Sequence, residues 1–291
     1  MDRQFDQVAR FAREAEGLGA GSLWVGDRVL AAVSPAVGYG GVGDSIPVEM
    51  RAALDPFVAL SVAAAVTERA LLGTSTLIAP WYPPLLLARS LSGIDVVSRG
   101  RLVVGIGTGW SPDEYEGVGV PWKERGARLD ECLDVLDAVW TTDPVDRHEG
   151  PHHAYPAAHI NPKPVQRPRP PVYLSAFSPA SQRRAARRAD GIMPVAMLTP
   201  GGGYDPTAVV SAPLQRIRRL AEAEDRDPAA VSAILRINPA AGSTPQDIAD
   251  AVLRTRDETD VQDAFVDLLY LVDQSVEQSL ELAGRILDLT R

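Results

Sequence analysis

Apolar residues recur along this chain at two spacings, and stretches of the two kinds alternate from one end to the other. A spacing of three and four residues predicts helices, whereas short runs of β-branched apolar residues predict strands. The predicted helices cover residues 5–17, 57–66, 84–97, 122–140, 180–188, 207–224, 246–256 and 276–287. The predicted strands cover residues 22–25, 71–76, 102–107, 172–175, a short run around 192, 234–237 and 265–269. This alternation indicates an α/β fold with a parallel sheet.

The number of strand–helix units favours a (β/α)8 TIM barrel over an open, doubly wound sheet, which remains the alternative. Such a barrel commonly takes about 250 residues, and this chain has 291. We therefore predict one barrel domain over residues 1–291, with irregular insertions near 30–55 and 143–171. The first insertion has four glycines between residues 38 and 43, and the second is rich in proline. Long loops in compact domains are usually functional, so both insertions are candidate lids.

The start of the chain lacks one element of this pattern. No apolar strand precedes the predicted helix at residues 5–17, so the first strand of the barrel is missing. An open barrel leaves backbone groups unpaired, which invites pairing with another chain, and a homodimer is one outcome that this allows. We expect instead that the natural protein begins upstream of Met1 and that the additional residues supply the strand.

Charge and cysteine content exclude several functions. The formal net charge of −9 disfavours nucleic acid and anionic membranes as partners, because both require a broad positive field. The single cysteine, Cys132, lies among Asp130, Glu131 and Asp134, which keep the pKa of its thiol from falling, so we interpret it as a packing residue. The sequence shows neither a signal peptide nor an apolar run of about 18 residues. We expect a cytoplasmic protein with a small-molecule substrate.

The segment at residues 101–138 is the most informative part of the chain. Val103, Val104 and Ile106 predict a strand buried on both faces. The glycines at 105, 107 and 109 remove side chains where a flat ligand or another backbone comes close. These glycines do not match the dinucleotide-binding fingerprint, because the third glycine and the acid about 20 residues further on do not follow its spacing. The segment therefore predicts a ligand-binding turn of another kind.

The string GWSPDEY, followed by VPWKERGARLDE, closely resembles the luciferase-like monooxygenase superfamily, and specifically its coenzyme F420-dependent oxidoreductase branch. The resemblance implies a barrel, a deazaflavin cofactor, and hydride transfer between coenzyme F420 and a small or medium organic substrate. Two alternatives stay open. One is an FMN-dependent monooxygenase of the same fold, and the other is a cofactor-binding paralogue without turnover. The segments at residues 30–46 and 193–206 are expected to line the substrate pocket.

The resemblance also implies catalytic residues. Asp27 and Arg28 end the string SLWVGDR, where many deazaflavin-dependent relatives have an acid followed by a histidine that handles protons. A guanidinium stays protonated, so Arg28 is suited to holding an anion and is a poor proton donor or base. Asp27 has three interpretations: a ligand role, a loop cap, or a salt bridge with Arg28.

Cofactor contacts are implied for the turns after three strands. The expected residues are Ser75, Thr76, Gly107, Thr108, Gly109, Trp110, Asp113, Ser175, Ala176, Phe177 and Ser178. The bond between Ser75 and Thr76 is expected to be a non-prolyl cis peptide behind the cofactor ring. The alternatives are an ordinary strand end at this position and a Trp110 that simply fills the mouth of the barrel. Relatives usually carry two glycines where Ser175 and Ala176 stand, which makes the fit looser there.

A basic segment follows the second insertion. Between Lys163 and Arg188 there are seven basic residues and no acid, and Ser178 with Pro179 reads as a helix start whose amides can hold an anion. This segment suits an anionic cofactor tail. The alternative is a solvated helix face whose arginines pair with acids elsewhere.

All four histidines fall in the second insertion. They are His148, His152, His153 and His159. Their surroundings offer no cysteine and no pair of carboxylates, so we expect exposed side chains and no zinc site. If the loop folds back, one of these histidines would reach over the active site as an acid or a substrate-binding group.

Overall fold

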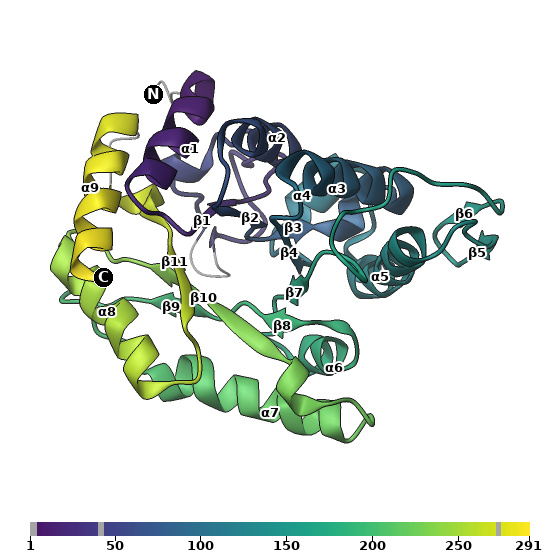
Figure 1. The fold of residues 1–291 in the computed structure, drawn as a ribbon. Helices are drawn as coiled ribbons and strands as arrows, with labels where there is room; N and C mark the ends of the chain where they lie inside the picture. Colours follow the sequence, from purple (N-terminus) through teal and green to yellow (C-terminus); the bar gives the residue numbers. More distant parts are fainter. Residues whose placement is uncertain (1–4, 40–43, 272–274) are drawn as a thin grey trace. The chain divides into compact units, whose positions relative to one another are not determined.

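The computed structural model describes residues 5–39, 44–271 and 275–291, and the chain forms two compact units (Figure 1). The central unit comprises Val25–Glu68 and Leu72–Pro171, and the terminal unit comprises Met1–Trp24, Arg69–Leu71 and Val172–Arg291. Two strands, β1 (Ser22–Val25) and β2 (Leu71–Thr74), contain residues of both units. Each unit is built from parallel strands that alternate with helices along the chain, as the apolar pattern predicts.

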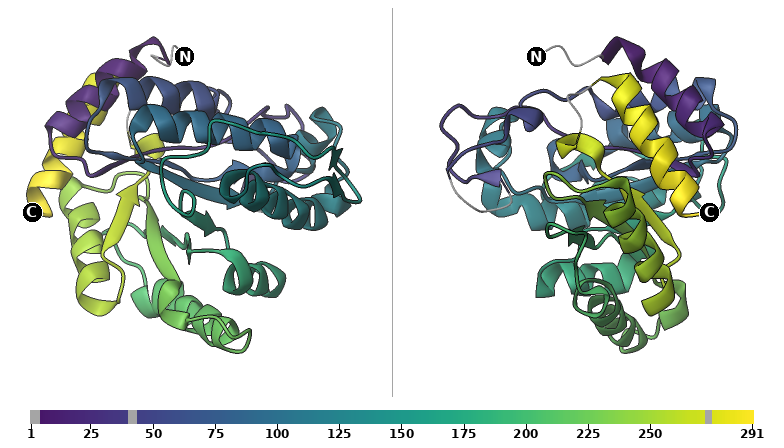
Figure 2. Two further views of the ribbon diagram at one scale, coloured as in Figure 1. Left: turned by 45° about the vertical axis from the view of Figure 1, so that its right-hand side comes forward. Right: turned by 90° about the vertical axis from the view of Figure 1, so that its left-hand side faces the viewer.

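In the central unit, strand β4 is the element around which the others are arranged. The further strands are β3 (Leu77–Ile78), β4 (Leu102–Gly107), β5 (His148–Glu149) and β6 (Ala154–Tyr155). The helices are α2 (Pro56–Val66), α3 (Pro84–Ser98), α4 (Pro112–Gly117) and α5 (Arg125–Thr141), with 3-10 turns at Val48–Met50, Ala79–Trp81 and Trp122–Glu124. Strand β4 is buried along its whole length and pairs in parallel with β2 and β3. Helices α2 and α3 lie side by side, and α3 also packs against α5 (Figure 2).

Local sequence explains where the helices of the central unit begin and end. The Asp55 side chain accepts a hydrogen bond from the Val58 amide at 2.9 Å, and Pro56 occupies the first turn, so α2 has a capped start. Helix α3 ends at Ser98 and is capped by Arg99, which adopts the left-handed conformation with φ of 60°. The next residue, Gly100, also has a positive φ, which glycine adopts at little steric cost.

The proline-rich crossing near residues 163–171 is held by one buried acid of α3. Asp95 is fully buried, and its carboxylate accepts hydrogen bonds from the Val165 amide at 2.6 Å and the Gln166 amide at 3.1 Å. The Gln166 side chain donates to the same carboxylate at 2.7 Å. A buried carboxylate needs such donors to offset its loss of hydration. Asp95 therefore fixes the path of this crossing against α3.

The histidines of the second insertion are arranged around Glu131 of α5, and the prediction that they are exposed is wrong for three of them. Glu131 accepts hydrogen bonds from the backbone of His152 and His153, at 3.0 and 2.9 Å, and contacts the His148 ring at 3.1 Å. His159 is exposed, as expected. The antiparallel hairpin β5–β6 brings the other three toward α5. In the described part of the chain, no group of three His, Cys, Asp or Glu side chains is arranged to hold a metal ion.

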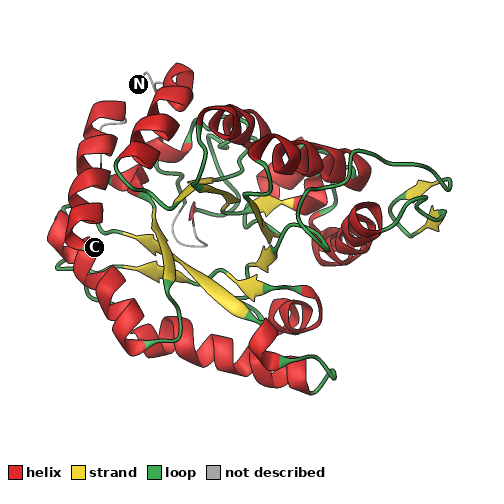
Figure 3. Ribbon diagram, viewed as in Figure 1, coloured by secondary structure: helices red, strands yellow, loops and turns green. Residues whose placement is uncertain are grey.

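In the terminal unit, β10 is the central strand. The strands are β7 (Val172–Leu174), β8 (Gly191–Ile192), β9 (Val195–Met197), β10 (Ser232–Asn238) and β11 (Asp263–Val266). The helices are α1 (Val8–Gly17), α6 (Pro179–Arg188), α7 (Ala212–Glu222), α8 (Pro245–Glu258) and α9 (Val276–Leu289). Strand β10 pairs in parallel with β8, β9 and β11, and β7 pairs with β8. Helices α7 and α8 lie along the same side of β10 and β11 (Figure 3).

Helices α1 and α9 of the terminal unit pack together through Ala15, Val276 and Leu280, with Phe11 and Leu23 against them. The described residues begin at Phe5, and within them no strand precedes α1. An extension of the natural protein upstream of Met1 stays a prediction. None of the helices described here is long and apolar enough to cross a membrane.

Some predicted elements differ from the structure. The predicted strand at residues 71–76 is broken after Thr74 into β2 and β3. The predicted strand at 265–269 lies earlier, as β11, because the Asp267 side chain accepts from the Leu269 amide and starts the 3-10 turn Leu268–Tyr270. The predicted helix at 207–224 begins with a π-helical turn, Thr207–Ser211. The structure adds α4, β9 and the hairpin β5–β6, and the glycines at 40, 41 and 43 lie outside the described residues.

Candidate active site

The candidate active site of the central unit lies where its strands end. The carboxyl ends of parallel strands meet at one edge of a sheet, and α/β barrels carry their active sites there. Segments 26–30, 75–76, 79–82 and 108–114 follow β1, β2, β3 and β4. They contain most of the residues predicted to form the site.

Asp27, just after β1, is a partly buried carboxyl held by two donors. Its side chain accepts from the Ile78 amide at 2.9 Å and from the Tyr82 hydroxyl at 2.9 and 3.0 Å. Burial raises the pKa of Asp27 to about 6, although the hydrogen bonds from Ile78 and Tyr82 lower it, and the nearby charges of Glu114 and Asp55 add to the rise. The Asp27 carboxyl therefore titrates near neutral pH, as a general acid or base requires.

Tyr82 is itself fixed and weakly acidic. Its ring packs edge-to-face against Phe57, with centroids 5.3 Å apart. Burial, followed by the charge of Asp27, raises the pKa of the Tyr82 hydroxyl above its ordinary value. The hydroxyl therefore stays protonated and acts as a donor to Asp27 at any physiological pH.

Arg28 is paired with Glu114, so the interpretation of a salt bridge between Asp27 and Arg28 is wrong. The Arg28 Nε atom lies 3.8 Å from Glu114 Oε1, and both side chains are more than nine-tenths buried. The same Nε donates to the Leu30 carbonyl at 3.0 Å. The guanidinium carbon lies 5.0 Å from the centroid of the Trp110 ring, within the range of a cation–π contact.

Glu114 is a buried acid at the candidate site to which the sequence alone assigns no role. It lies in the first turn of α4, whose N-cap is Ser111, and it accepts from the Val29 amide at 3.0 Å. Burial raises the pKa of Glu114, while the charge of Arg28 and the backbone donors lower it. The acidic run at residues 113–116 was the only signal in the sequence, because a six-residue helix has no clear apolar spacing.

The segment after β2 contains the expected cis peptide. The bond between Ser75 and Thr76 is cis, which confirms the prediction made from the family resemblance. The Ser75 amide donates to the Val25 carbonyl at 2.8 Å. The Thr74 hydroxyl donates to the Gly105 carbonyl at 2.8 Å and accepts from the Gly105 amide at 2.9 Å, which joins the end of β2 to the interior of β4.

The turn after β4 requires a glycine at position 109. Gly109 has a φ of +66°, and a Cβ atom placed there would lie 3.1 Å from the Ile78 side chain. Tyr115 donates to the Thr108 carbonyl at 2.6 Å, which fixes the turn from α4. The Trp110 ring meets Tyr39 edge-to-face, with centroids 5.4 Å apart. Trp110 is thus held between a cation and an aromatic edge.

Asp113 has a role that the sequence did not reveal. Its carboxylate accepts from the Ala36 amide at 3.1 and 3.3 Å, which ties the loop after β1 to α4. The central unit therefore brings together Asp27, Arg28, Ser75, Thr76, Gly107, Thr108, Gly109, Trp110 and Asp113. A contact of any of these residues with a cofactor stays a prediction.

The remaining predicted residues, 175–178, belong to the terminal unit. Ser178 is the N-cap of α6 and forms a capping box with Ser181, which confirms the predicted helix start. Phe177 is 70% exposed. In the basic segment, Arg169 pairs with Asp137 at 2.9 Å, and Arg184 is buried rather than solvated. Their role toward an anionic cofactor stays a prediction.

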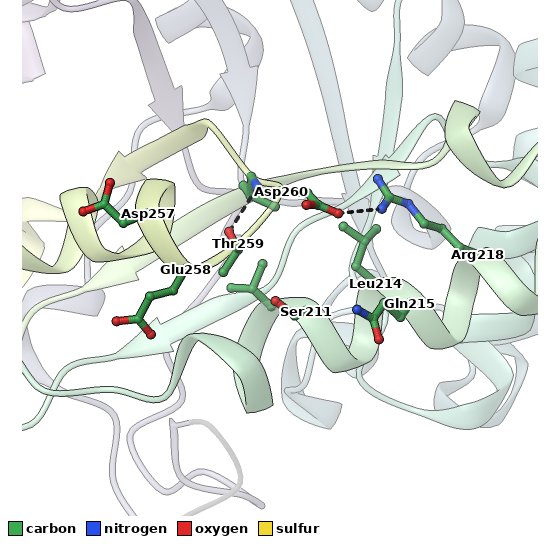
Figure 4. A pocket seen from close by; sticks show the side chains of 10 residues that line it. Ser211, Leu214, Gln215, Arg218, Asp257, Glu258, Thr259 and Asp260 are labelled. Carbon is green, nitrogen blue, oxygen red and sulfur yellow. Dashed lines mark hydrogen bonds and ion pairs between the residues drawn. The ribbon is translucent and has the colours of Figure 1, made fainter.

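A cavity of about 270 Å³ lies in the terminal unit, between α7 and the end of α8 (Figure 4). Arg218, which lines it, pairs with Asp260 at 3.2 Å and donates to the Val231 carbonyl at 3.0 Å. The cavity lies next to residues 257–261, which precede β11, and not beyond the carboxyl end of a strand. None of the predicted site residues lines it. We do not assign the active site to this cavity.

Parallel strands alternating with helices, with polar side chains gathered after the strands, define an α/β barrel of the kind that oxidoreductases use. The chain belongs to the luciferase-like monooxygenase family, whose model matches residues 2–290. Members of this family are oxidoreductases and monooxygenases. The family assignment confirms the luciferase-like superfamily predicted from GWSPDEY and VPWKERGARLDE, and the F420-dependent branch stays a prediction.

Curated relatives match part of the chain. An uncharacterized protein of Mycobacterium tuberculosis is 34% identical over 186 residues, which is 63% of this chain and 65% of that protein. The oxygenase component of a flavin-dependent trigonelline monooxygenase from Acinetobacter baylyi is 31% identical over 147 residues, which is 50% of this chain and 40% of that protein. The matches thus span less than two thirds of these relatives' length.

Solved structures match nearly the whole chain. Monooxygenase RslO1 from Streptomyces bottropensis has a TM-score of 0.77 at 22% identity, covering 98% of this chain and 92% of that one. An F420-dependent secondary alcohol dehydrogenase in complex with an F420–acetone adduct has a TM-score of 0.75 at 15% identity, covering 100% and 96%. At these identities the likeness shows the fold, and it confirms the predicted α/β TIM-barrel class.

Proposed function

We propose that this protein is an oxidoreductase that transfers a hydride between coenzyme F420 and a small or medium organic substrate. The observation that carries the proposal is Asp27, a partly buried carboxyl with a pKa of about 6 at the end of β1. A group that titrates near neutral pH beside a substrate can exchange the proton that accompanies a hydride. The likeness to an F420-dependent alcohol dehydrogenase over the whole chain supports this choice of cofactor.

The residues present fit a flat tricyclic ring. Gly109 leaves the turn after β4 without a side chain, and a Cβ there would already crowd Ile78. The backbone at Ser75, Thr76 and Thr108 follows β2 and β4 in the central unit, where the site is expected. These residues would hold the deazaflavin, which supplies two-electron hydride chemistry when bound.

Asp27 would move the proton, and its two donors set when it can do so. The Ile78 amide and the Tyr82 hydroxyl hold the carboxyl in one orientation. Above a pH of about 6 the carboxyl is ionised and accepts a proton, as the oxidation of an alcohol requires. Below that pH it is protonated and donates, as the reduction of a carbonyl requires. Asp27 thereby takes the role for which many relatives use a histidine.

An FMN-dependent monooxygenase is the second candidate. The sequence relative from Acinetobacter baylyi is the oxygenase component of a flavin-dependent monooxygenase, and the RslO1 structure is also a monooxygenase. Cofactor preference separates the two candidates, because F420 carries hydride and does not activate oxygen as FMN does.

The test is titration of cofactor-free protein with coenzyme F420 and with FMN, followed by fluorescence. We expect tighter binding of F420, and comparable or tighter binding of FMN would favour the monooxygenase. Gly109→Ala should weaken binding of the preferred cofactor by at least tenfold. The matched control is Gly119→Ala, at a φ of +71° where a Cβ meets nothing within 4 Å. Tight F420 binding without turnover of ketones, enones and alcohols would support a non-catalytic paralogue.

A further inference from the structure

Arg28 has a buried donor that the fold leaves unused. In the described part of the chain, three buried side-chain polar atoms lack a hydrogen-bond partner: Arg28 Nη2, Trp81 Nε1 and Ser243 Oγ. Only the first belongs to a charged group. A buried donor without an acceptor is destabilising, and most such atoms in folded proteins are paired. An unpaired one at a candidate active site indicates that an acceptor arrives with a ligand.

The surroundings of Arg28 hold its guanidinium in a fixed position. The Nε atom donates to the Leu30 carbonyl at 3.0 Å, and the guanidinium carbon lies over the Trp110 ring, 5.0 Å from its centroid. Arg28 follows Asp27 directly, at the end of β1 where the barrel carries its site. The free donor is therefore positioned by contacts on other atoms of the same side chain. Because Nη2 is enclosed, the arrival of an acceptor would require a side-chain rotamer change nearby, of the kind that is common on binding.

The charge around Arg28 decides which acceptor fits. Glu114 lies 3.8 Å away and balances the guanidinium charge. The positive charge of Arg28 is therefore already compensated. A carboxylate on a ligand would lose its hydration without meeting an uncompensated positive charge and would be repelled by Glu114, whereas a neutral oxygen would only satisfy the unused donor.

We propose that Arg28 Nη2 donates a hydrogen bond to a neutral oxygen of the substrate, a carbonyl or hydroxyl, and that the Arg28–Glu114 pair selects such substrates against carboxylates. The proposal names the substrate class for the proposed function and rests on it. Arg28 binds and orients in this scheme, and it exchanges no proton, because a guanidinium stays protonated. A neutral oxygen is favoured because it satisfies the unused donor of Arg28, and a carboxylate is disfavoured because Glu114 repels its charge.

The test compares two ligands of similar size, acetophenone and benzoate, with ethylbenzene as a ligand that has no acceptor. Binding to the full chain is measured by ligand-observed NMR. We expect acetophenone to bind at least tenfold tighter than benzoate and than ethylbenzene. Arg28→Met should lose that preference over ethylbenzene, because it removes the donor and keeps an apolar stem of similar length.

Glu114→Gln provides the sharper comparison. Glutamine retains a carbonyl oxygen for the Val29 amide but removes the charge that balances Arg28. We expect benzoate to bind about tenfold tighter than it binds to the wild type, with acetophenone little changed. Unchanged relative binding of benzoate and acetophenone in Glu114→Gln would overturn the proposal, as would acetophenone binding that survives Arg28→Met.

A second variant covers a failure of Arg28→Met to fold. Arg28→Lys keeps the charge and loses Nη2, so acetophenone binding should again fall by about tenfold, and undiminished binding would overturn the proposal. The result is separable from the cofactor titration. If the protein selects among these ligands but does not bind F420, the proposed cofactor is wrong and the role of Arg28 stands. If it binds F420 without this selectivity, the proposed cofactor stands and the role of Arg28 is wrong.

Discussion

Two buried or partly buried carboxylates of the central unit, Glu131 and Asp27, show how partners decide what an acid can do. Burial alone would raise the pKa of both. Around Glu131, hydrogen bonds from His148, His153 and His152 outweigh burial and lower the pKa. Around Asp27, hydrogen bonds from the Ile78 amide and the Tyr82 hydroxyl lower the pKa by less than burial raises it, and the pKa rises to about 6. The first acid is a structural anchor for a hairpin, and the second is left able to titrate.

Two arginines differ in a similar way, in how completely their donors are paired. In the terminal unit, Arg236 and Asp267 form an ion pair, and the Arg236 Nε atom also donates to Asn238 at 2.9 Å. The nearest carboxylate to Arg28 lies 3.8 Å away, and its buried Nη2 atom has no hydrogen-bond partner. Of these two arginines, Arg28 is the one with an unpaired buried donor, and the segment after β1 is where we place substrate.

Replacement of Asp27 should have the largest effect. Asp27→Asn keeps the shape and the acceptor oxygen but removes the titrating proton, so we expect turnover to fall by about 100-fold or more. The variant should still fold cooperatively, which circular dichroism on heating checks. Steady-state turnover of the substrate found in an alcohol and ketone panel is the measurement. An active Asp27→Asn enzyme would return Asp27 to the role of a loop cap.

Replacement of Glu131 should do the opposite. Glu131→Ala leaves two backbone amides and the His148 ring without their acceptor, so we expect a loss of about 2–3 kcal/mol of unfolding free energy. Urea titration measures this loss. The matched control is Glu149→Ala on the exposed side of the same hairpin, which should change stability by less than about 0.5 kcal/mol. Equal effects of the two changes would show that Glu131 is no anchor.

The two acids should also respond to pH with opposite signs. The pKa of Asp27 is higher in the folded protein than its ordinary value of 3.8, so its contribution to stability is fully present below that value and is lost as pH rises through about 6. The pKa of Glu131 is lowered, so its contribution is present above 4.5 and is lost as pH falls. Unfolding free energies of Asp27→Asn and Glu131→Gln, each subtracted from those of the wild type across this range, should slope in opposite directions. Parallel slopes would contradict the comparison.

The smallest effect is expected for Tyr82→Phe. This change removes one donor to Asp27 and keeps the ring contact with Phe57. Because the Tyr82 hydrogen bond lowers the pKa of Asp27, its loss should move the midpoint of the activity–pH profile upward, by up to about one unit. Phe57→Leu, which removes no donor, is the control. An unmoved midpoint in Tyr82→Phe would mean that the hydroxyl does not set the pKa.

The strands that carry the site could be predicted because their composition is local. The β-branched run at residues 102–107 and the short strand at 22–25 coincide with β4 and β1. The break of the strand at 71–76 could only be inferred through the family resemblance, since nothing in LGTST differs from ordinary strand residues. The hairpin β5–β6 was missed because strands of two residues have no periodicity.

The partners within the site could not be predicted, because they come from distant positions. The pKa of Asp27 depends on Ile78 and Tyr82, more than fifty residues further along the chain. The pairing of Arg28 with Glu114 joins two loops that the sequence does not connect. Cys132 is the converse case. Its acidic neighbours were visible, and burial does raise the pKa of its thiol to about 12. The sequence shows which residues carry ionisable groups, whereas the pKa values and partners of those groups depend on how the folded chain packs around them.

The most direct test of this account is the titration of Asp27 itself. The side-chain carboxyl carbon of aspartate, labelled with carbon-13, is followed by NMR between pH 3 and 8, and the Asp27 signal is identified by its absence from Asp27→Asn. We expect a midpoint near pH 6, about two units above an ordinary aspartate. A midpoint near 4 would show a carboxyl that is already ionised at every working pH, and it would contradict the central claim that Asp27 is poised to exchange a proton.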